Sequence, residues 1–150
     1  MPASDIKRFL QWIFFNLLVG NNNSHAKNSI YFPPNLGARL SSFYDLLCTS
    51  IYPGLSSQFA FKVGEEAKPS QISKAHIGNM AKELGFKERY VLKTGQELAE
   101  NLQAQLATVA REMNSVATPG TEQAMIERLT QHISSNTKQL QKRFFGNEGN

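Results

Sequence analysis

The chain has 150 residues, of which 41% are hydrophobic and 19% charged, and its formal net charge is +4. This size and composition predict one soluble globular domain with its own core. The small positive charge favours anionic partners, such as nucleotide phosphates or nucleic acid, and does not specify a fold. The apolar run 9–19 contains Gln11 and Asn16 and is shorter than the roughly 20 residues that cross a bilayer. We therefore expect no membrane association.

Cys48 is the sole cysteine of the sequence, which excludes an internal disulfide bond. The chain is therefore expected in a reducing compartment, and we predict that it is cytoplasmic. The apolar neighbours of Cys48 predict a small core residue.

The first predicted element is a helix that begins near Ser4 or Asp5, whose side chains can cap it, and that ends at Gly20. Apolar side chains occupy almost every side of this helix. We therefore expect it to be the central helix of the core, with Trp12 as a core residue.

A polar loop, residues 20–28, follows this helix and leads into a predicted hairpin over residues 28–43. Ile30 and Phe32 alternate with their neighbours, and the Pro- and Gly-containing stretch 33–37 is typical of a turn. A helical turn is predicted at 44–48, a turn at 51–54 and an extended segment at 59–64.

The remainder of the chain is predicted to be helical. A helix over residues 70–84 ends at Gly85, and Thr94-Gly95-Gln96-Glu97 has the pattern of a capping box that opens a long helix. Residues 118–121 break that helix, and a last helix spans 122–145. The apolar stripe of the long helix comprises Leu98, Leu102, Leu106, Val109 and Met113. The fold class is therefore mainly α, a helical lobe with one small β-hairpin.

The polar loop has the residue types and spacing of a phosphoryl-transfer site. In protein kinases a catalytic Asp precedes a magnesium-binding Asn by five residues, and a second magnesium-binding Asp follows a hairpin. Asn23 precedes Asn28 by five positions, and Asp45 follows the predicted hairpin. Amide and carboxylate oxygens suit Mg²⁺, while His25 and Lys27 are placed to approach the transferred phosphate.

The loop Gly20-Asn21-Asn22-Asn23-Ser24-His25-Ala26-Lys27-Asn28, with Phe43-Tyr44-Asp45-Leu46-Leu47 and Ile51-Tyr52-Pro53, closely resembles the C-terminal domain of HipA-type serine/threonine kinase toxins. The resemblance extends from about Asp5 to Met113. It implies a bacterial kinase of a toxin–antitoxin module, linked to growth arrest and persistence, that uses ATP and Mg²⁺.

The resemblance also implies partners and residue roles. The expected substrate is a protein, such as an aminoacyl-tRNA synthetase, and the expected partner is a HipB-like antitoxin, through which DNA is contacted indirectly. Asn28 and Asp45 carry over as the magnesium ligands. His25 and Lys27 carry over as loop residues beside the phosphates, with Lys27 also contacting the nucleotide.

The sequence departs from the family pattern in two ways. The family's catalytic aspartate falls at Asn23, whose amide cannot accept a hydroxyl proton as a carboxylate does. We also expect the family's N-terminal ATP-binding lobe to be missing, because residues 1–19 contain no glycine-rich phosphate loop. We therefore expect residues 1–150 to form a single C-terminal kinase lobe, with the loop and hairpin in 1–68 and a helical bundle in 69–145, that is inactive by itself.

Two other functions remain open. The chain could be a non-catalytic module that binds an antitoxin or a separately encoded N-terminal lobe, or a basic helical nucleic-acid binder. His76 and His132 are not at metal-ligand spacing with each other or with Cys48, and we expect both histidines at the surface. Lys138, Lys142 and Arg143 are expected to form a solvated helix face. A lobe that normally meets a partner should also expose a large apolar patch.

Overall fold

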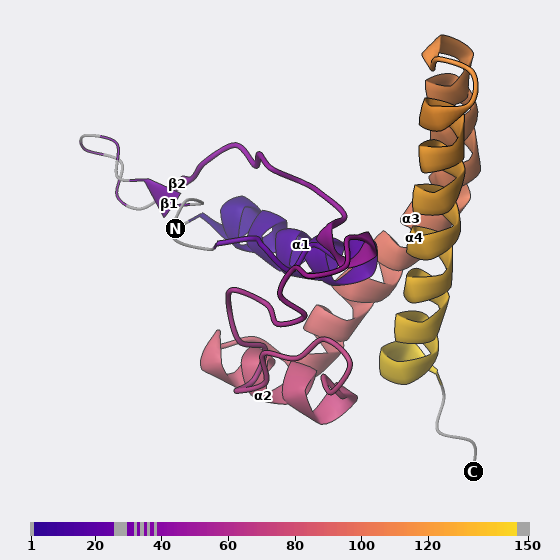
Figure 1. The fold of residues 1–150 in the computed structure, drawn as a ribbon. Helices are drawn as coiled ribbons and strands as arrows, with labels where there is room; N and C mark the ends of the chain where they lie inside the picture. Colours follow the sequence, from indigo (N-terminus) through magenta and orange to yellow (C-terminus); the bar gives the residue numbers. More distant parts are fainter. Residues whose placement is uncertain are drawn as a thin grey trace.

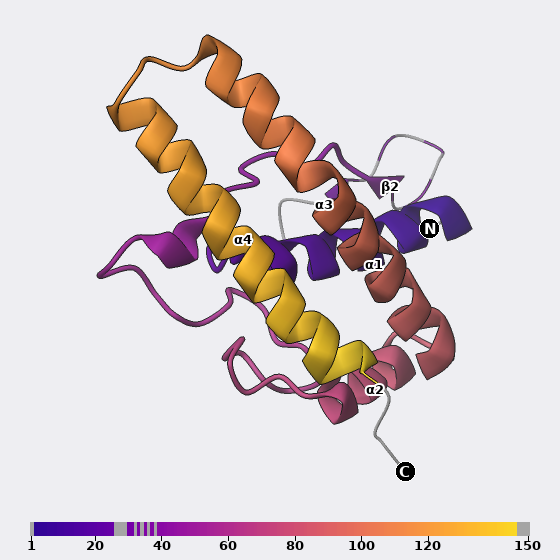
Figure 2. The same ribbon diagram turned by 90° about the vertical axis from the view of Figure 1, so that its right-hand side faces the viewer.

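The fold, seen in a computed structural model that describes residues 2–25, 30–31, 33, 35, 37 and 39–146, is mainly helical, as predicted. Its helices are α1 (Ala3–Val19), α2 (Lys74–Glu83), α3 (Glu88–Val116) and α4 (Thr121–Phe145), with a short 3₁₀ helix, η2 (Thr49–Ile51). Strands β1 (Ile30–Tyr31) and β2 (Arg39–Leu40) form an antiparallel pair. Helix α1 lies across α3 and α4, and α2 packs beside the first turns of α3 (Figures 1 and 2).

Helix α1 is the central helix of the core, as its composition predicted. Leu10 and Phe14 are fully buried, and the helix contacts α3, α4 and β2. The helix ends at Gly20, which has a φ of 75°, a left-handed conformation that glycine adopts without steric cost. Trp12 is buried as expected and stacks on Phe61, with 5.2 Å between ring centroids.

The predicted cap at the start of α1 is wrong. Pro2 occupies the N-cap position, and no side chain caps the helix there. Asp5 is instead buried and accepts hydrogen bonds from Arg39 Nε at 2.7 Å and from the backbone N–H of Leu40 at 3.1 Å. Both hydrogen bonds lower the pKa of Asp5, and the bond from Arg39 makes the larger contribution. Its carboxylate therefore attaches β2 to α1.

The predicted hairpin is present with very short strands, in which Ile30 pairs with Leu40 and Tyr31 with Arg39. The helical turn predicted at 44–48 is wrong, because residues 41–48 have no regular structure and the turn comes at η2. The extended segment predicted at 59–64 is reduced to a single bridge between Val63 and Glu66, because the chain reverses direction at residues 64–65.

In the second half of the chain α2 starts later than predicted and is shorter, whereas α3 starts earlier and is longer. Helix α2 begins at Lys74, where Ser73 and His76 form a capping box, and α3 runs unbroken from Glu88. The capping box predicted at 94–97 is therefore wrong. Thr94 is buried inside α3 and donates its hydroxyl hydrogen to the carbonyl of Tyr90 at 3.0 Å.

Helices α3 and α4 lie side by side, and their joined ends stand clear of the rest of the molecule (Figure 1). The break between them and the extent of α4 match the prediction to within one or two residues. Only part of the predicted α3 stripe is covered, because Val109 and Met113 lie on this projecting part and are 49% and 52% exposed. Among the described helices, none is long and apolar enough to cross a membrane.

Candidate functional site

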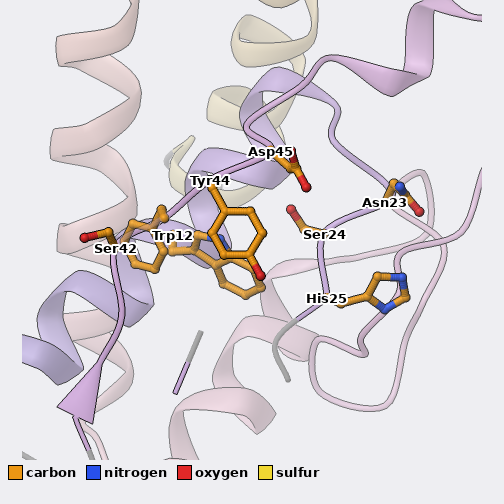
Figure 3. Close-up of a pocket in the computed structure, with 8 residues that line it drawn as sticks. Trp12, Asn23, Ser24, His25, Ser42, Tyr44 and Asp45 are labelled. Carbon is orange, nitrogen blue, oxygen red and sulfur yellow. The ribbon is translucent and has the colours of Figure 1, made fainter. Parts of the chain in front are cut away.

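A small cavity of about 100 Å³ lies between the loop that follows α1 and the segment that follows β2. Figure 3 shows its lining, in which Asn23 and His25 stand on the loop and Asp45 on the facing segment. Three of the predicted site residues therefore share one cavity, although their chemical roles stay predictions. Lys27 and Asn28 lie outside the described residues. The complete lining is Trp12, Asn23, Ser24, His25, Ser42, Phe43, Tyr44 and Asp45.

The buried side chain of Asn21 joins the two sides of the cavity. Its Nδ2 donates to Asn16 Oδ1, to Ser24 Oγ and to the carbonyl oxygen of Asp45, each at 2.9 Å. Ser24 in turn donates to Asn16 Oδ1 at 2.6 Å, and Asn16 Nδ2 donates to the carbonyl of Trp12 at 2.7 Å. This buried network fixes the loop to α1 and fixes Asp45 to the loop.

The first part of the loop is held by η2. The backbone N–H of Asn22 donates to Thr49 Oγ1 at 2.8 Å, and the Thr49 hydroxyl donates to the carbonyl of Gly20 at 3.3 Å. The backbone N–H of Ser50 donates to the same carbonyl at 3.0 Å. The carbonyl of Gly20, the residue that ends α1, therefore finds its hydrogen-bond donors in η2 rather than in water.

Asp45 presents an exposed carboxylate to the cavity (Figure 3). Its backbone is held in the left-handed region, at φ 53°, which is uncommon for a residue other than glycine. In the described part of the chain no cation forms an ion pair with this carboxylate. Its oxygens are therefore available to an external ligand.

The donor set of the cavity fits Mg²⁺. Asp45 offers carboxylate oxygens and Asn23 an amide oxygen, and Mg²⁺ favours oxygen ligands while keeping several waters or phosphate oxygens. The described residues contain no cluster of three His, Cys, Asp or Glu side chains that could hold a metal by themselves. One carboxylate and one amide would leave most positions around such an ion to water or phosphate oxygens.

Asn23 is exposed, and its backbone N–H donates to Asn21 Oδ1 at 3.3 Å. This bond orients the start of the loop and leaves the Asn23 side chain at the cavity. A carboxamide carries no basic oxygen, so this position can donate or accept a hydrogen bond but cannot take a proton from a hydroxyl group.

Sequence reasoning missed the residues that support the cavity. Asn16 and Asn21 carry the network, and the available signal was a polar Asn16 inside a largely apolar stretch of helix.

The prediction for Cys48 is wrong: the thiol is only half-buried, and this partial burial raises its pKa. His132 is partly exposed but bonds to Ser50 Oγ through Nε2 at 2.7 Å, a contact that its polar neighbours did not indicate.

Comparison with known proteins assigns the sequence that contains this loop to a family. The family described as the HipA-like C-terminal domain matches residues 1–106. The chain belongs to the HipA-like C-terminal domain family. The match includes the whole of the loop, the hairpin, η2 and α2, and it ends within α3.

Curated relatives and a solved structure agree with this membership. The chain is 34% identical over 84 residues to Y4mE of Sinorhizobium fredii, covering 56% of this chain and 20% of the relative. It is 27% identical over 108 residues to the serine/threonine-protein kinase toxin HipA of Shewanella oneidensis, covering 72% of this chain and 25% of the relative.

The solved structure is a chain of the toxin–antitoxin complex of HipA, HipB and operator DNA from Shewanella oneidensis. It superposes with a TM-score of 0.80 at 21% identity, covering 92% of this chain and 32% of that chain. The fold is therefore shared. This HipA-like domain spans about a fifth to a quarter of the length of the curated relatives it matches.

Proposed function

We propose that this chain is the catalytic C-terminal lobe of a HipA-like serine/threonine kinase, with its phosphoryl-transfer site in the cavity between Asn23 and Asp45. The observation that carries the proposal is the Asn21 side chain, which ties the loop to the carbonyl of Asp45 at 2.9 Å. Phosphoryl transfer depends mainly on positioning and electrostatic stabilisation, which a fixed loop and a carboxylate residue with an anchored backbone would provide.

In this proposal Asp45 and Asn28 hold Mg²⁺, and His25 and Lys27 lie beside the phosphates of ATP. The ion would neutralise charge on the transferred phosphoryl group. Asp45 is suited to its role because its carboxylate is exposed to the cavity while its backbone is anchored by Asn21.

We propose that Asn23 occupies the position of the family's catalytic base and that the chain with Asn23 is therefore severely impaired in phosphoryl transfer. A general base contributes about 10²- to 10⁴-fold to the rate, and an amide cannot replace that contribution. The protein substrate, of which an aminoacyl-tRNA synthetase is one example, and a HipB-like antitoxin partner are part of the same proposal. So is an N-terminal lobe that would cover the nucleotide.

A second function, a non-catalytic interaction module, is favoured by the apolar surface beside the cavity. Tyr44, Leu46 and Leu47 lie within four consecutive residues around Asp45, and they are 57%, 44% and 56% exposed. Large apolar side chains that cluster at a surface are typical of protein contacts. An N-terminal lobe or an antitoxin docked there would cover them without any chemistry at Asp45.

The first test is calorimetric titration of Mg²⁺–ATP into the chain and into Asp45→Ala. We expect measurable binding that Asp45→Ala abolishes. Glu65→Ala is the matched control, because Glu65 is also an exposed carboxylate residue with positive φ but does not line the cavity. Equal binding by the chain and by Asp45→Ala would refute the assignment of Asp45.

The second test restores the base with Asn23→Asp and supplies the N-terminal lobe of a HipA relative as a separate polypeptide. We expect transfer of labelled phosphate to a protein substrate by Asn23→Asp and about 10²- to 10⁴-fold less by the chain with Asn23. A reconstituted complex that binds both components yet transfers no phosphate would leave the interaction module as the function.

A further inference from the structure

Helix α4 carries three polar side chains at intervals of four residues, Arg128, His132 and Asn136. Residues at this spacing lie on one face of a helix. Their hydrogen bonds reach η2 and the last turn of α1, the helix beside which α4 packs. This face of α4 is therefore polar where a helix packed on a core is normally apolar.

Each of the three side chains makes a hydrogen bond over a long sequence separation. Arg128 donates to the carbonyl of Ile51, and His132 Nε2 bonds to Ser50 Oγ at 2.7 Å. Asn136 Nδ2 donates to the carbonyls of Leu17 and Leu18 at 2.9 and 2.8 Å. Two of the side chains hold η2, and the third holds the last turn of α1.

The contact with η2 leads directly to the candidate site. Ser50 is close to the start of the loop, since a Cβ added to Gly20 would lie 2.1 Å from Ser50 Oγ and 3.5 Å from His132 Nε2. The N–H of Ser50 bonds to the Gly20 carbonyl, and the N–H of Asn22 bonds to Thr49 Oγ1. Displacement of η2 would therefore release both ends of the stretch that contains Asn21.

We infer that Arg128 and His132 are positioning residues, which hold η2 against Gly20–Asn22 and thereby fix the separation of the loop from Asp45. This inference rests on the proposed function for the chemistry of the site, but the positioning itself can be measured without any activity. Both residues lie beyond residues 1–106, where the family match ends. The helix that follows the matched region thus completes the site.

The test is backbone amide hydrogen exchange on the full chain and on His132→Leu, His132→Gln, Arg128→Met and Arg128→Lys. The reporters are the N–H groups of Asn22 and Ser50. We expect the apolar variants to raise exchange at both reporters by roughly two- to tenfold, the factor that one net hydrogen bond supplies. The Gln and Lys variants keep a donor and should restore slow exchange. Lys138→Met is the control, because Lys138 is an exposed cation of α4 that does not share the four-residue spacing of this face.

Amides in the last turns of α4, around Leu140, report on folding of the helix itself. The inference is supported if the apolar variants exchange faster at Asn22 and Ser50 but not at Leu140. The Gln and Lys variants should then restore slow exchange at the two reporters. Unchanged loop exchange would overturn it, and so would faster exchange throughout α4, which would mean a general loss of stability.

Mg²⁺–ATP titration of the same variants separates this inference from the proposed function. Weaker binding in the apolar variants, in proportion to their faster loop exchange, supports both. If the natural chain binds no nucleotide while its loop exchange still depends on Arg128 and His132, the proposed function fails and the positioning role stands.

Discussion

Replacement of Asn21 by Asp should destabilise the fold strongly although the two side chains have nearly the same shape. The Asn21 Nδ2 shares two hydrogens among three acceptors, Asn16 Oδ1, Ser24 Oγ and the Asp45 carbonyl. Loss of two hydrogen bonds costs about 1–3 kcal/mol, and the new buried carboxylate facing three acceptor oxygens adds about 1–3 kcal/mol more. The free energy of unfolding should therefore fall by at least about 2 kcal/mol.

Urea unfolding at pH 7 measures this loss, provided that the dependence on urea concentration is the same for the natural chain and the variant. Asn101→Asp is the matched control, because it adds the same charge at an exposed position of α3. The deficit of Asn21→Asp should shrink at lower pH, where the buried carboxyl group takes up a proton and can donate again. A stability within about 0.5 kcal/mol of Asn101→Asp would refute the role given to Asn21.

Two further predictions concern the two ends of α1. Gly20→Ala should cost about 1–3 kcal/mol more than Gly54→Ala in urea unfolding. Both glycines have positive φ, but only at Gly20 would the new Cβ meet Ser50 Oγ. Equal losses of unfolding free energy in the two variants would show that Ser50 moves aside freely. The folded-state pKa of Asp5 is lowered below its usual 3.8, so its contribution to stability is present above that pH and is lost as the pH falls through the lowered value. The stability difference between the natural chain and Asp5→Asn should therefore narrow in acid, and a difference independent of pH would mean that the ion pair with Arg39 contributes nothing.

The parts of the fold that could be predicted from sequence are those set by local chemistry. Helix α1 follows from its apolar run, its end follows from a glycine with positive φ, and the break before α4 follows from Pro119 and Gly120. The spacing of Asn23 and Asp45 around a hairpin likewise indicated that the two would lie near one another, and they line one cavity.

The parts that could not be predicted depend on contacts between distant segments. Thr94 and Gly95 look like the start of a helix, yet both are buried within α3, where Gly95 faces α1. A Cβ at Gly95 would lie 2.6 Å from the ring of Phe14, so this glycine lets two helices cross closely. The contact of His132 could not be predicted either, because its partner Ser50 is 82 residues away in the sequence and no local pattern links the two.

The bonds from Asn136 to the end of α1 also set the earliest point during synthesis at which the fold can be completed. The acceptor Leu17 and the donor Asn136 are 119 residues apart. At the usual pace of synthesis, about 5–20 residues per second, roughly 6 to 24 s pass between the two. During that interval the Asn-rich loop has left the ribosome without the helix that holds its neighbour η2. A nascent chain would therefore expose the loop and its apolar surroundings to chaperones before α4 could hold η2 against them.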